Sequence, residues 1–303
     1  MSRTDRVANR SLPQRVLATT KGCVNSLIVG FNTLIVFSLM VPCALLKAAL
    51  RVAPARRFAD RVLNALASTW VRINGWWIDA AQAIRWDVQG IDALSPRGWY
   101  LVSSNHQSWV DILVLQKVFL GHIPFLKFFL KRELIYVPVI GLAWWALDFP
   151  FMQRKGGFKS GKNDLAATRK ACERFKLIPT SVMNFLEGTR YTPAKRESQR
   201  SPYQHLLKPR VGGLAVALGT MGEMFDSLLD VTIVYPQQIP TFWEILAGEV
   251  REVVVRVQQV AIPAELLGGD YEGDPGFRAK LQAWVAGMWA SKDQQIERIL
   301  ARK

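Results

Sequence analysis

The feature that most constrains the fold of this chain is a long uncharged segment near its N-terminus. From Gly22 to Leu46 there are 25 residues without a charged side chain, and they include Leu27, Phe31 and Leu39. A helix of about 20 apolar residues is enough to cross the hydrocarbon core of a bilayer. The segment is longer than the apolar region of a usual signal peptide, and no clear cleavage site follows it. We therefore expect it to be retained as part of a helical membrane module.

The residues around this segment leave its position in the membrane open. Five basic residues precede it and five follow it, so the positive-inside rule indicates no orientation, and this equality favours both ends on the cytoplasmic side. Gly30, Asn32 and Pro42 predict a break, which would give a re-entrant or monotopic helical pair. A single span and a helix buried against the rest of the protein are the alternatives. Residues 58–84 then place apolar residues and tryptophans at helical spacing, typical of an interfacial helix and equally of a helix packed on a domain.

Composition indicates an anionic partner. The chain has 39 basic and 24 acidic residues, a net charge of +15, and half of its residues are hydrophobic. Nucleic acid, anionic lipid and coenzyme A would all suit this charge. The sequence contains no zinc finger, RNA-binding signature or basic helix with heptads, so nucleic acid is the weakest of the three. Membrane lipid is the partner that fits best.

Strand-like and helix-like segments alternate after the N-terminal module. The strands are expected at residues 99–104, 180–186, 231–235 and 252–260, and the helices at 109–120, 163–176, from 211, and from 275 to the end. This alternation predicts an α/β fold, a mixed and mostly parallel sheet flanked by helices, over residues 86–303. Residues 1–85 would form the helical membrane module in front of it. Residues 134–152 are apolar but contain prolines and an aspartate, so a helix followed by a core strand is expected there rather than a second span.

His106 lies in the turn between the strand at 99–104 and the helix at 109–120. At about 100° per residue, two helical residues five apart point roughly 140° from each other, so His106 and Asp111 can meet only if His106 precedes the helix. A carboxylate on one ring nitrogen fixes the tautomer and leaves the other nitrogen free to take a proton from a hydroxyl. His106 is therefore a candidate general base, and a hydrogen bond that merely caps the helix is the alternative. With three histidines and no metal-ligand spacing, no metal site is predicted.

A second candidate element, Glu187-Gly188-Thr189-Arg190, follows the strand at 180–186. A glycine allows the backbone to approach a ligand closely, and arginine presents a fork of donors that matches phosphate oxygens. Taken alone, the turn could be an ordinary one with a surface ion pair. Both candidate elements follow strands, however, and the carboxyl ends of strands are where open α/β sheets hold ligands.

Four blocks, taken in order, resemble the glycerophospholipid acyltransferase family, which includes the 1-acyl-sn-glycerol-3-phosphate (lysophosphatidate) acyltransferases. The blocks are residues 105–111 with the His-x4-Asp pattern, 149–154, 185–190 and 234–236. A stretch beginning at Lys131 is similar to the family's Lys-x-Glu-Leu sequence. The resemblance covers about residues 85–260, and it implies the fold of a glycerolipid acyltransferase.

The resemblance also implies roles for the matched residues. His106, oriented by Asp111, would deprotonate the free hydroxyl of the acceptor as it attacks a thioester carbonyl. Lys131, Arg154 and Arg190 would hold the acceptor phosphate. Gly188 and Thr189 would share the binding turn, and Glu187 would orient the cations. The resemblance implies no metal or prosthetic group, and it implies acyl-CoA or acyl carrier protein as the co-substrate. No cysteine lies in a matched block, so a thioester on the enzyme is not expected.

The expected activity is the acylation of lysophosphatidate to phosphatidate, at the cytoplasmic side of an inner membrane. Residues 192–198 and 207–210 resemble one subgroup that also includes enzymes acting on lysocardiolipin or lysophosphatidylinositol, so the acceptor stays open. A non-catalytic lipid-binding membrane protein is the third hypothesis. The chain departs from many family members at Asp148, where they carry glycine, and this residue would hydrogen-bond an acceptor hydroxyl or cap a strand.

Overall fold

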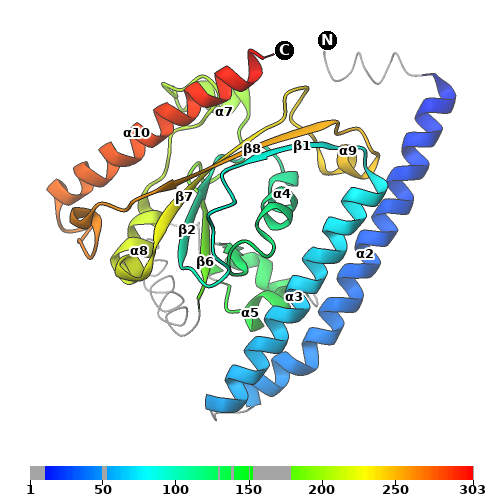
Figure 1. Cartoon of the computed structure of the whole chain (residues 1–303), viewed down its shortest axis with the longest axis horizontal. Helices are drawn as coiled ribbons and strands as arrows, with labels where there is room; N and C mark the ends of the chain where they lie inside the picture. The colour runs from blue at the N-terminus through cyan, green and yellow to red at the C-terminus, as the bar shows by residue number, and fades with distance from the viewer. Residues whose placement is uncertain are drawn as a thin grey trace.

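A twisted sheet of six strands, with helices on both faces, forms the centre of the molecule (Figure 1). The computed structural model describes residues 11–49, 53–128, 130–137, 140–149, 151–152 and 179–302. The strands are β1 (Arg85–Gln89), β2 (Tyr100–Ser104), β3 (Leu126–Phe128), β6 (Ser181–Phe185), β7 (Ser227–Val234) and β8 (Glu252–Val260). Their order is β1-β8-β7-β2-β6-β3; β7 and β8 are antiparallel, and every other neighbouring pair is parallel. The predicted mixed, mostly parallel sheet is confirmed.

The central strands are buried on both faces. All residues of β2 and β7 are buried, as expected for strands that are covered by helices on both sides. Successive side chains of a strand point to opposite faces. Accordingly, Tyr100 and Val102 join one hydrophobic core, and Leu101 joins the other.

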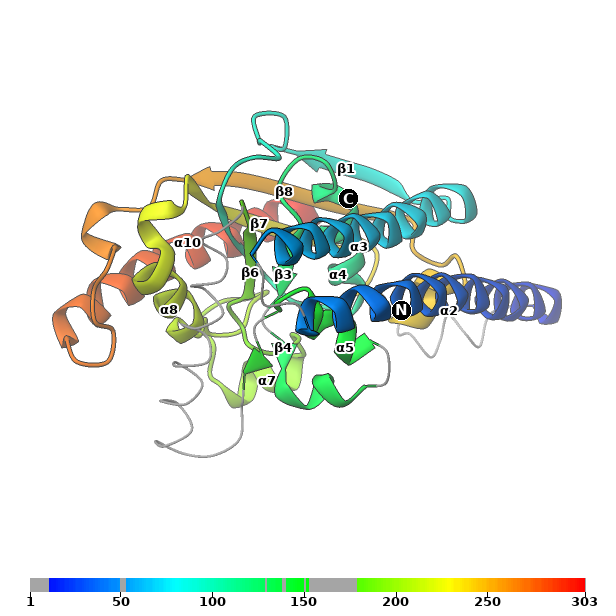
Figure 2. The same ribbon diagram turned by 90° about the horizontal axis from the view of Figure 1, so that it is seen from below.

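The two cores correspond to two helical layers. On one face lie α2 (Leu12–Ala49), α3 (Ala53–Ala81) and α4 (Val110–Phe119), and on the other lie α8 (Gly212–Met221) and α10 (Pro275–Leu300) (Figures 1 and 2). α10 begins at an Asp274 cap, whose side chain accepts from two backbone N–H groups of its first turn. Its buried residues recur every three or four positions, which gives the apolar stripe that an amphipathic helix needs.

Short elements complete the fold, and two of them correct the sequence expectations. They are β4 (Leu130–Lys131), η1 (Arg132–Tyr136), α5 (Ile140–Ala146), β5 (Phe151–Met152), α7 (Pro193–Ser198), η2 (Gly222–Met224), α9 (Phe242–Leu246) and η3 (Ala264–Leu266). β5 is not a core strand, because it pairs with β4 in a separate two-stranded sheet. No helix was expected between residues 190 and 211, but the chain forms α7 there, because Thr192 caps its first turn. The helix expected at 163–176 lies outside the described residues.

The expected break in the N-terminal segment is wrong. α2 is one helix through Gly30, Asn32 and Pro42. α3 runs antiparallel beside it (Figure 1), and Asn32 Nδ2 donates to Asn74 Oδ1 of α3 at 2.8 Å. Packing of this kind supplies stability that local propensity lacks, so the helix continues past residues that would interrupt an isolated one.

The two sides of α2 have different surroundings. Its inner side packs on α3 and on the sheet's core through Val36, Phe37 and Met40. Its outer side exposes large apolar residues, for example Leu27 at 73% and Phe31 at 65%. Within the described ranges, α2 is the helix that is long and apolar enough to cross a membrane. An exposed apolar face of this extent is typical of contact with lipid or another protein.

Candidate active site

His106 lies just after the carboxyl end of β2 and before α4. Asn105 continues the sheet, because its side chain exchanges two hydrogen bonds with the backbone of Ile233 in β7, each 2.9 Å long. α4 then begins at Val110, so Asp111 is in its first turn. His106 Nδ1 and Asp111 Oδ2 are 2.9 Å apart. The geometry that the spacing requires, a histidine before its helix, is therefore present.

The Asp111 carboxylate is fully buried and is surrounded by donors. Oδ2 accepts from the backbone N–H groups of Gln107 at 2.6 Å and Ser108 at 2.8 Å, as well as facing His106 Nδ1. Oδ1 accepts from the Tyr235 hydroxyl at 2.6 Å. Burial and the neighbouring Asp111 raise the pKa of Tyr235 well above its usual value, so this hydroxyl keeps its proton and donates. A carboxylate held in this way favours a proton on Nδ1 and leaves Nε2 to accept one.

The plane of the imidazole is fixed by stacking. The His106 ring lies on the ring of Phe185, with centroids 3.9 Å apart and an interplanar angle of 14°. Phe185 in turn stacks on Phe128 of β3. His106 keeps a small exposed fraction, 12% of its side chain, while Asp111 has none. The base is thus oriented from one side by its carboxylate and from below by an aromatic ring, with access left to solvent or substrate.

Glu187 joins the two candidate elements through the backbone. Its Oε1 accepts from the N–H of His106 at 2.8 Å, and its Oε2 accepts from the N–H of Leu207 at 3.2 Å. Burial raises the pKa of Glu187 to about 8, so the group carries little charge at neutral pH. The expected role of orienting cations is therefore not what these contacts describe. Glu187 instead holds the His106 turn against the segment around Leu207.

The Gly188-Thr189-Arg190 turn lies directly beside His106. The backbone N–H of Tyr191 donates to the His106 carbonyl at 2.7 Å. Gly188 has a φ of +66°, in the left-handed region that favours glycine. Thr189 accepts a hydrogen bond from Lys195 Nζ at 2.8 Å, and the Arg190 guanidinium lies 5.0 Å from the Trp109 ring centroid. The turn presents an exposed cation next to the base, as an anion site would require.

The other two expected phosphate cations are only partly placed. The backbone of Lys131 lies in β4 and pairs in register with Met152 of β5. Its side chain and all of Arg154 lie outside the described residues. The register brings Lys131 opposite a residue only two positions before Arg154. It therefore places Lys131 beside β5, the strand that ends two positions before Arg154 in the sequence.

Two contributors to the site were not singled out from the sequence. Tyr235 was noted only as part of the fourth block, and nothing in the spacing showed that its hydroxyl reaches Asp111. Asn105 was noted only as the first residue of its block, although its amide fixes the end of β2 against β7. Both contacts join residues more than 120 positions apart, so local patterns carry no signal for them.

Among the residues that the structure describes, no group of three His, Cys, Asp or Glu side chains is placed to hold a metal ion.

Asp148 binds a lysine of the N-terminal hairpin. Its Oδ2 is 2.6 Å from Lys47 Nζ of α2, and the same nitrogen is 2.7 Å from Asp60 Oδ1 of α3 and donates to the Ala146 carbonyl at 2.7 Å. The buried Lys127 of β3 belongs to this cluster, and desolvation lowers its pKa to about 8. Asp148 has a φ of +58°. This backbone conformation is less favourable for a residue with a Cβ atom than for glycine. Where many family members carry glycine, this chain thus has an aspartate that forms an ion pair with Lys47 of α2.

We expect Lys47→Met to lower the free energy of unfolding by about 2 kcal/mol, less than for a fully buried pair because both carboxylates are partly exposed. Adding Asp148→Gly should recover part of this loss, because it removes a carboxylate that has lost its contact with Lys47 and suits the positive φ. Asp148→Ala is the matched control, since it removes the carboxylate and keeps the Cβ atom. Equal stability of the two double variants, measured by chemical denaturation in mild detergent, would show that the backbone conformation contributes nothing.

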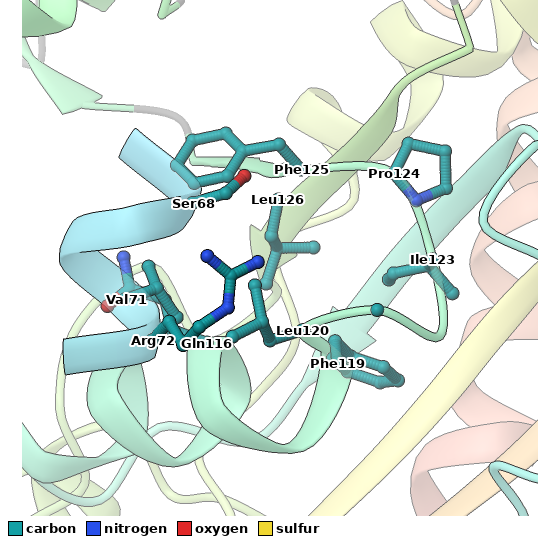
Figure 3. A pocket seen from close by; sticks show the side chains of 11 residues that line it. Ser68, Val71, Arg72, Gln116, Phe119, Leu120, Ile123, Pro124, Phe125 and Leu126 are labelled. Carbon is teal, nitrogen blue, oxygen red and sulfur yellow. The ribbon is translucent and has the colours of Figure 1, made fainter. Parts of the chain in front are cut away.

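A pocket lies at the C-terminal end of α4, away from the end that carries Asp111, and Figure 3 shows the side chains that line it. It has a volume of about 220 Å³ and is lined by Val71 and Arg72 of α3 and by Phe119, Leu120 and Pro124. α4 has ten residues, so its two ends are about 15 Å apart. The pocket is therefore separate from the His106 centre.

Comparisons with known proteins agree with the sequence blocks. A family model described as Acyltransferase matches residues 85–235. Lysocardiolipin acyltransferase 1 of Danio rerio is 26% identical over 253 residues, covering 78% of this chain and 61% of that protein. The 1-acyl-sn-glycerol-3-phosphate acyltransferase 3 of Arabidopsis thaliana is 25% identical over 262 residues, covering 82% of this chain and 65% of that protein. The chain thus spans less than two thirds of the length of these relatives.

The fold also matches a solved structure. The crystal structure of the 1-acyl-sn-glycerophosphate acyltransferase PlsC from Thermotoga maritima has a TM-score of 0.55 with 17% sequence identity. The match covers 94% of this chain and 99% of that chain. At this identity the likeness concerns the fold, and it extends beyond the sheet to the N-terminal helices.

Proposed function

Because the chain belongs to the acyltransferase family, we propose that it transfers a fatty acyl group from an acyl thioester to the free hydroxyl of lysophosphatidate, giving phosphatidate. The observation that carries this proposal is the contact between His106 Nδ1 and the buried Asp111 carboxylate at 2.9 Å. This contact leaves the second ring nitrogen available to accept a proton. The segment that follows Arg190 contacts the His106 backbone, and an acceptor with a phosphate would bind there. A lipid-binding protein without catalysis would have no use for a base oriented in this way.

The proposed reaction proceeds by direct transfer. His106 Nε2 takes the proton of the acceptor hydroxyl as its oxygen attacks the thioester carbonyl carbon, and a tetrahedral intermediate forms. The C–S bond then breaks, and the leaving thiolate takes the proton from the imidazolium. Asp111 holds the ring and stabilises its charged form, and Tyr235 holds Asp111 through the 2.6 Å hydrogen bond. The donor is acyl-CoA or acyl carrier protein, both of which carry the acyl group as a thioester.

The acceptor phosphate is assigned to Arg190, with Lys131 and Arg154 as further cations. Arg190 has an exposed guanidinium on the turn that contacts the His106 backbone. Holding the phosphate there would place the hydroxyl of the same small molecule beside His106 and reduce the entropic cost of reaction. We assign the membrane contact to the exposed apolar side of α2, with the catalytic site at the cytoplasmic face of an inner membrane.

The acceptor is tested with a panel of lysolipids. We expect purified protein in phospholipid nanodiscs to acylate lysophosphatidate faster than lysocardiolipin or lysophosphatidylinositol, when either acyl-CoA or acyl carrier protein is the donor. Product formation is followed with labelled acyl groups and chromatography. Fast acylation of another acceptor without turnover of lysophosphatidate would overturn the substrate assignment and leave the chemistry in place.

A second acceptor has a specific observation in its favour. One of the similar proteins is named lysocardiolipin acyltransferase 1, and its identity to this chain, 26%, is no lower than that of the similar protein named for lysophosphatidate. A lysocardiolipin carries two phosphates, so it would need cations beyond the Arg190 turn. The same panel separates this candidate from the first.

A further inference from the structure

A second cleft lies beside the Arg190 turn, between residues 202–212 and α10. We call it the loop cleft, and it is lined mainly by Tyr203, Lys208, Arg210, Tyr271 and Gln282. Its volume is about 500 Å³, which is large enough for a headgroup or a nucleotide. The cleft does not contain His106, and neither the four matched blocks nor the proposed reaction uses it; its lining includes Lys208, Pro209 and Arg210, from the stretch that resembles one subgroup of the family.

The loop cleft is positively charged. Lys208 and Arg210 are both exposed, and none of the residues that line the cleft is acidic. The cleft also includes Gly212, where α8 begins. The first turn of α8 has no acidic residue and no side-chain cap, so the positive end of the helix adds to the two cations.

Arg210 connects this cleft to the candidate active site. Its backbone N–H donates to the Leu186 carbonyl at 2.6 Å. Its side chain passes so close to Gly188 that a Cβ atom there would lie 3.0 Å from Arg210 Cδ. The Arg210 side chain therefore lies against the Gly188-Thr189-Arg190 turn. Arg190 and Arg210 therefore belong to two segments that meet at Gly188.

The segment that carries Lys208 and Arg210 is held in place before any ligand binds. Asp293 of α10 accepts from the backbone N–H groups of Gln204 at 2.8 Å and His205 at 2.7 Å. Trp289 Nε1 of α10 donates to the Leu207 carbonyl at 2.9 Å, and the Leu207 N–H donates to Glu187. Fixing a loop in advance lowers the entropic cost of binding. The backbone of this segment is therefore held in place by its contacts with α10 and Glu187.

We propose that the loop cleft is a second phosphate-binding subsite, in which Lys208 and Arg210 hold a phosphate group of a substrate whose reactive end lies at His106. The inference rests on the proposed function for the identity of that substrate. Two sources supply such a phosphate: the nucleotide end of a coenzyme A thioester, or a second phosphate in the acceptor headgroup. Both present the same chemistry to two cations and a helix N-terminus.

The first test measures binding without catalysis. Purified protein in mild detergent is titrated calorimetrically with adenosine 3′,5′-bisphosphate, which represents the donor, and with bis(glycerophospho)glycerol, which represents a two-phosphate headgroup. We expect one probe to bind, and we expect Arg210→Gln or Lys208→Gln to weaken it by about tenfold or more, since each removes a charge-assisted hydrogen bond. Lys280→Gln, an exposed lysine of α10 away from the cleft, is the matched control. Absence of binding by both probes, or equal binding in all variants, would overturn the proposal.

The second test identifies the source during turnover. If the donor occupies the cleft, Arg210→Gln should raise KM for acyl-CoA and leave KM for acyl-dephospho-CoA unchanged. If the headgroup occupies it, the variant should raise KM for a two-phosphate acceptor and leave that for lysophosphatidate unchanged. The His106→Ala variant should lose acyl transfer and still bind the probe. Failure of the acyltransferase assignment would therefore appear in the rate measurement, and failure of the subsite proposal would appear in the binding measurement.

Discussion

His106→Ala should lower the rate of acyl transfer by about 100- to 10,000-fold, because a positioned general base contributes that much to a proton transfer. The imidazole is held by Asp111 at 2.9 Å and stacked on Phe185, so its loss removes both the base and its geometry. The rate is measured with labelled acyl donor and saturating acceptor. The effect should fall on kcat, since the acceptor phosphate is assigned to other residues.

The matched control is His122→Ala, a histidine after α4 that lies outside the candidate site. We expect it to keep the wild-type rate. The thermal unfolding of His106→Ala is measured in parallel, so that a loss of fold is not mistaken for a loss of chemistry. Wild-type turnover by a well-folded His106→Ala protein would remove the base assignment, whichever acceptor is used.

Lys292→Met should have the largest effect on stability and lower the free energy of unfolding by about 3–5 kcal/mol, as measured for buried ion pairs that lose one partner. Lys292 of α10 is fully buried, and its Nζ is 2.8 Å from Asp230 Oδ1 of β7 and donates to the Val231 carbonyl. Methionine fills a similar volume, so the cost comes from an unpaired carboxylate and carbonyl rather than from a cavity. Chemical denaturation in mild detergent gives the value.

The double variant Lys292→Met with Asp230→Asn tests this cause. We expect it to be more stable than Lys292→Met, because a neutral amide is less costly to bury than an unpaired carboxylate. Lys280→Met, on the exposed side of the same helix, should change stability by less than about 0.5 kcal/mol. If single and double variants unfold alike, the ion pair is not the source of the effect.

The same ion pair explains where the sequence prediction of a strand fell short. The strand at 252–260 was placed with its observed bounds, because its valines alternate between clear turns. β7, expected from residue 231, begins at Ser227. Asp230 is a polar residue in a buried strand, and its partner Lys292 lies 62 positions later on α10. A local pattern treats such a residue as surface, because the compensating charge is remote in sequence.

For a related reason, the sequence predicted some contacts of the candidate site and missed others. The spacing predicted a contact between His106 and Asp111 on the condition that His106 precedes its helix, and the structure meets this condition. The expectation that Glu187 orients cations did not anticipate its hydrogen bonds to the His106 and Leu207 backbone. Sequence shows that a carboxylate is present and does not show that two backbone donors from distant segments face it.

By itself, the sequence determined the alternation of strands and helices, the α/β class and the pairing of a histidine with its carboxylate. These depend on periodicity and short spacing, which act within a few turns of chain. Only the tertiary structure decided that α2 continues through Pro42, that Tyr235 supports Asp111, and that Arg210 passes beside Gly188. Each of these depends on packing or hydrogen bonds between segments that meet only when the sheet is assembled, and no local pattern encodes that energy.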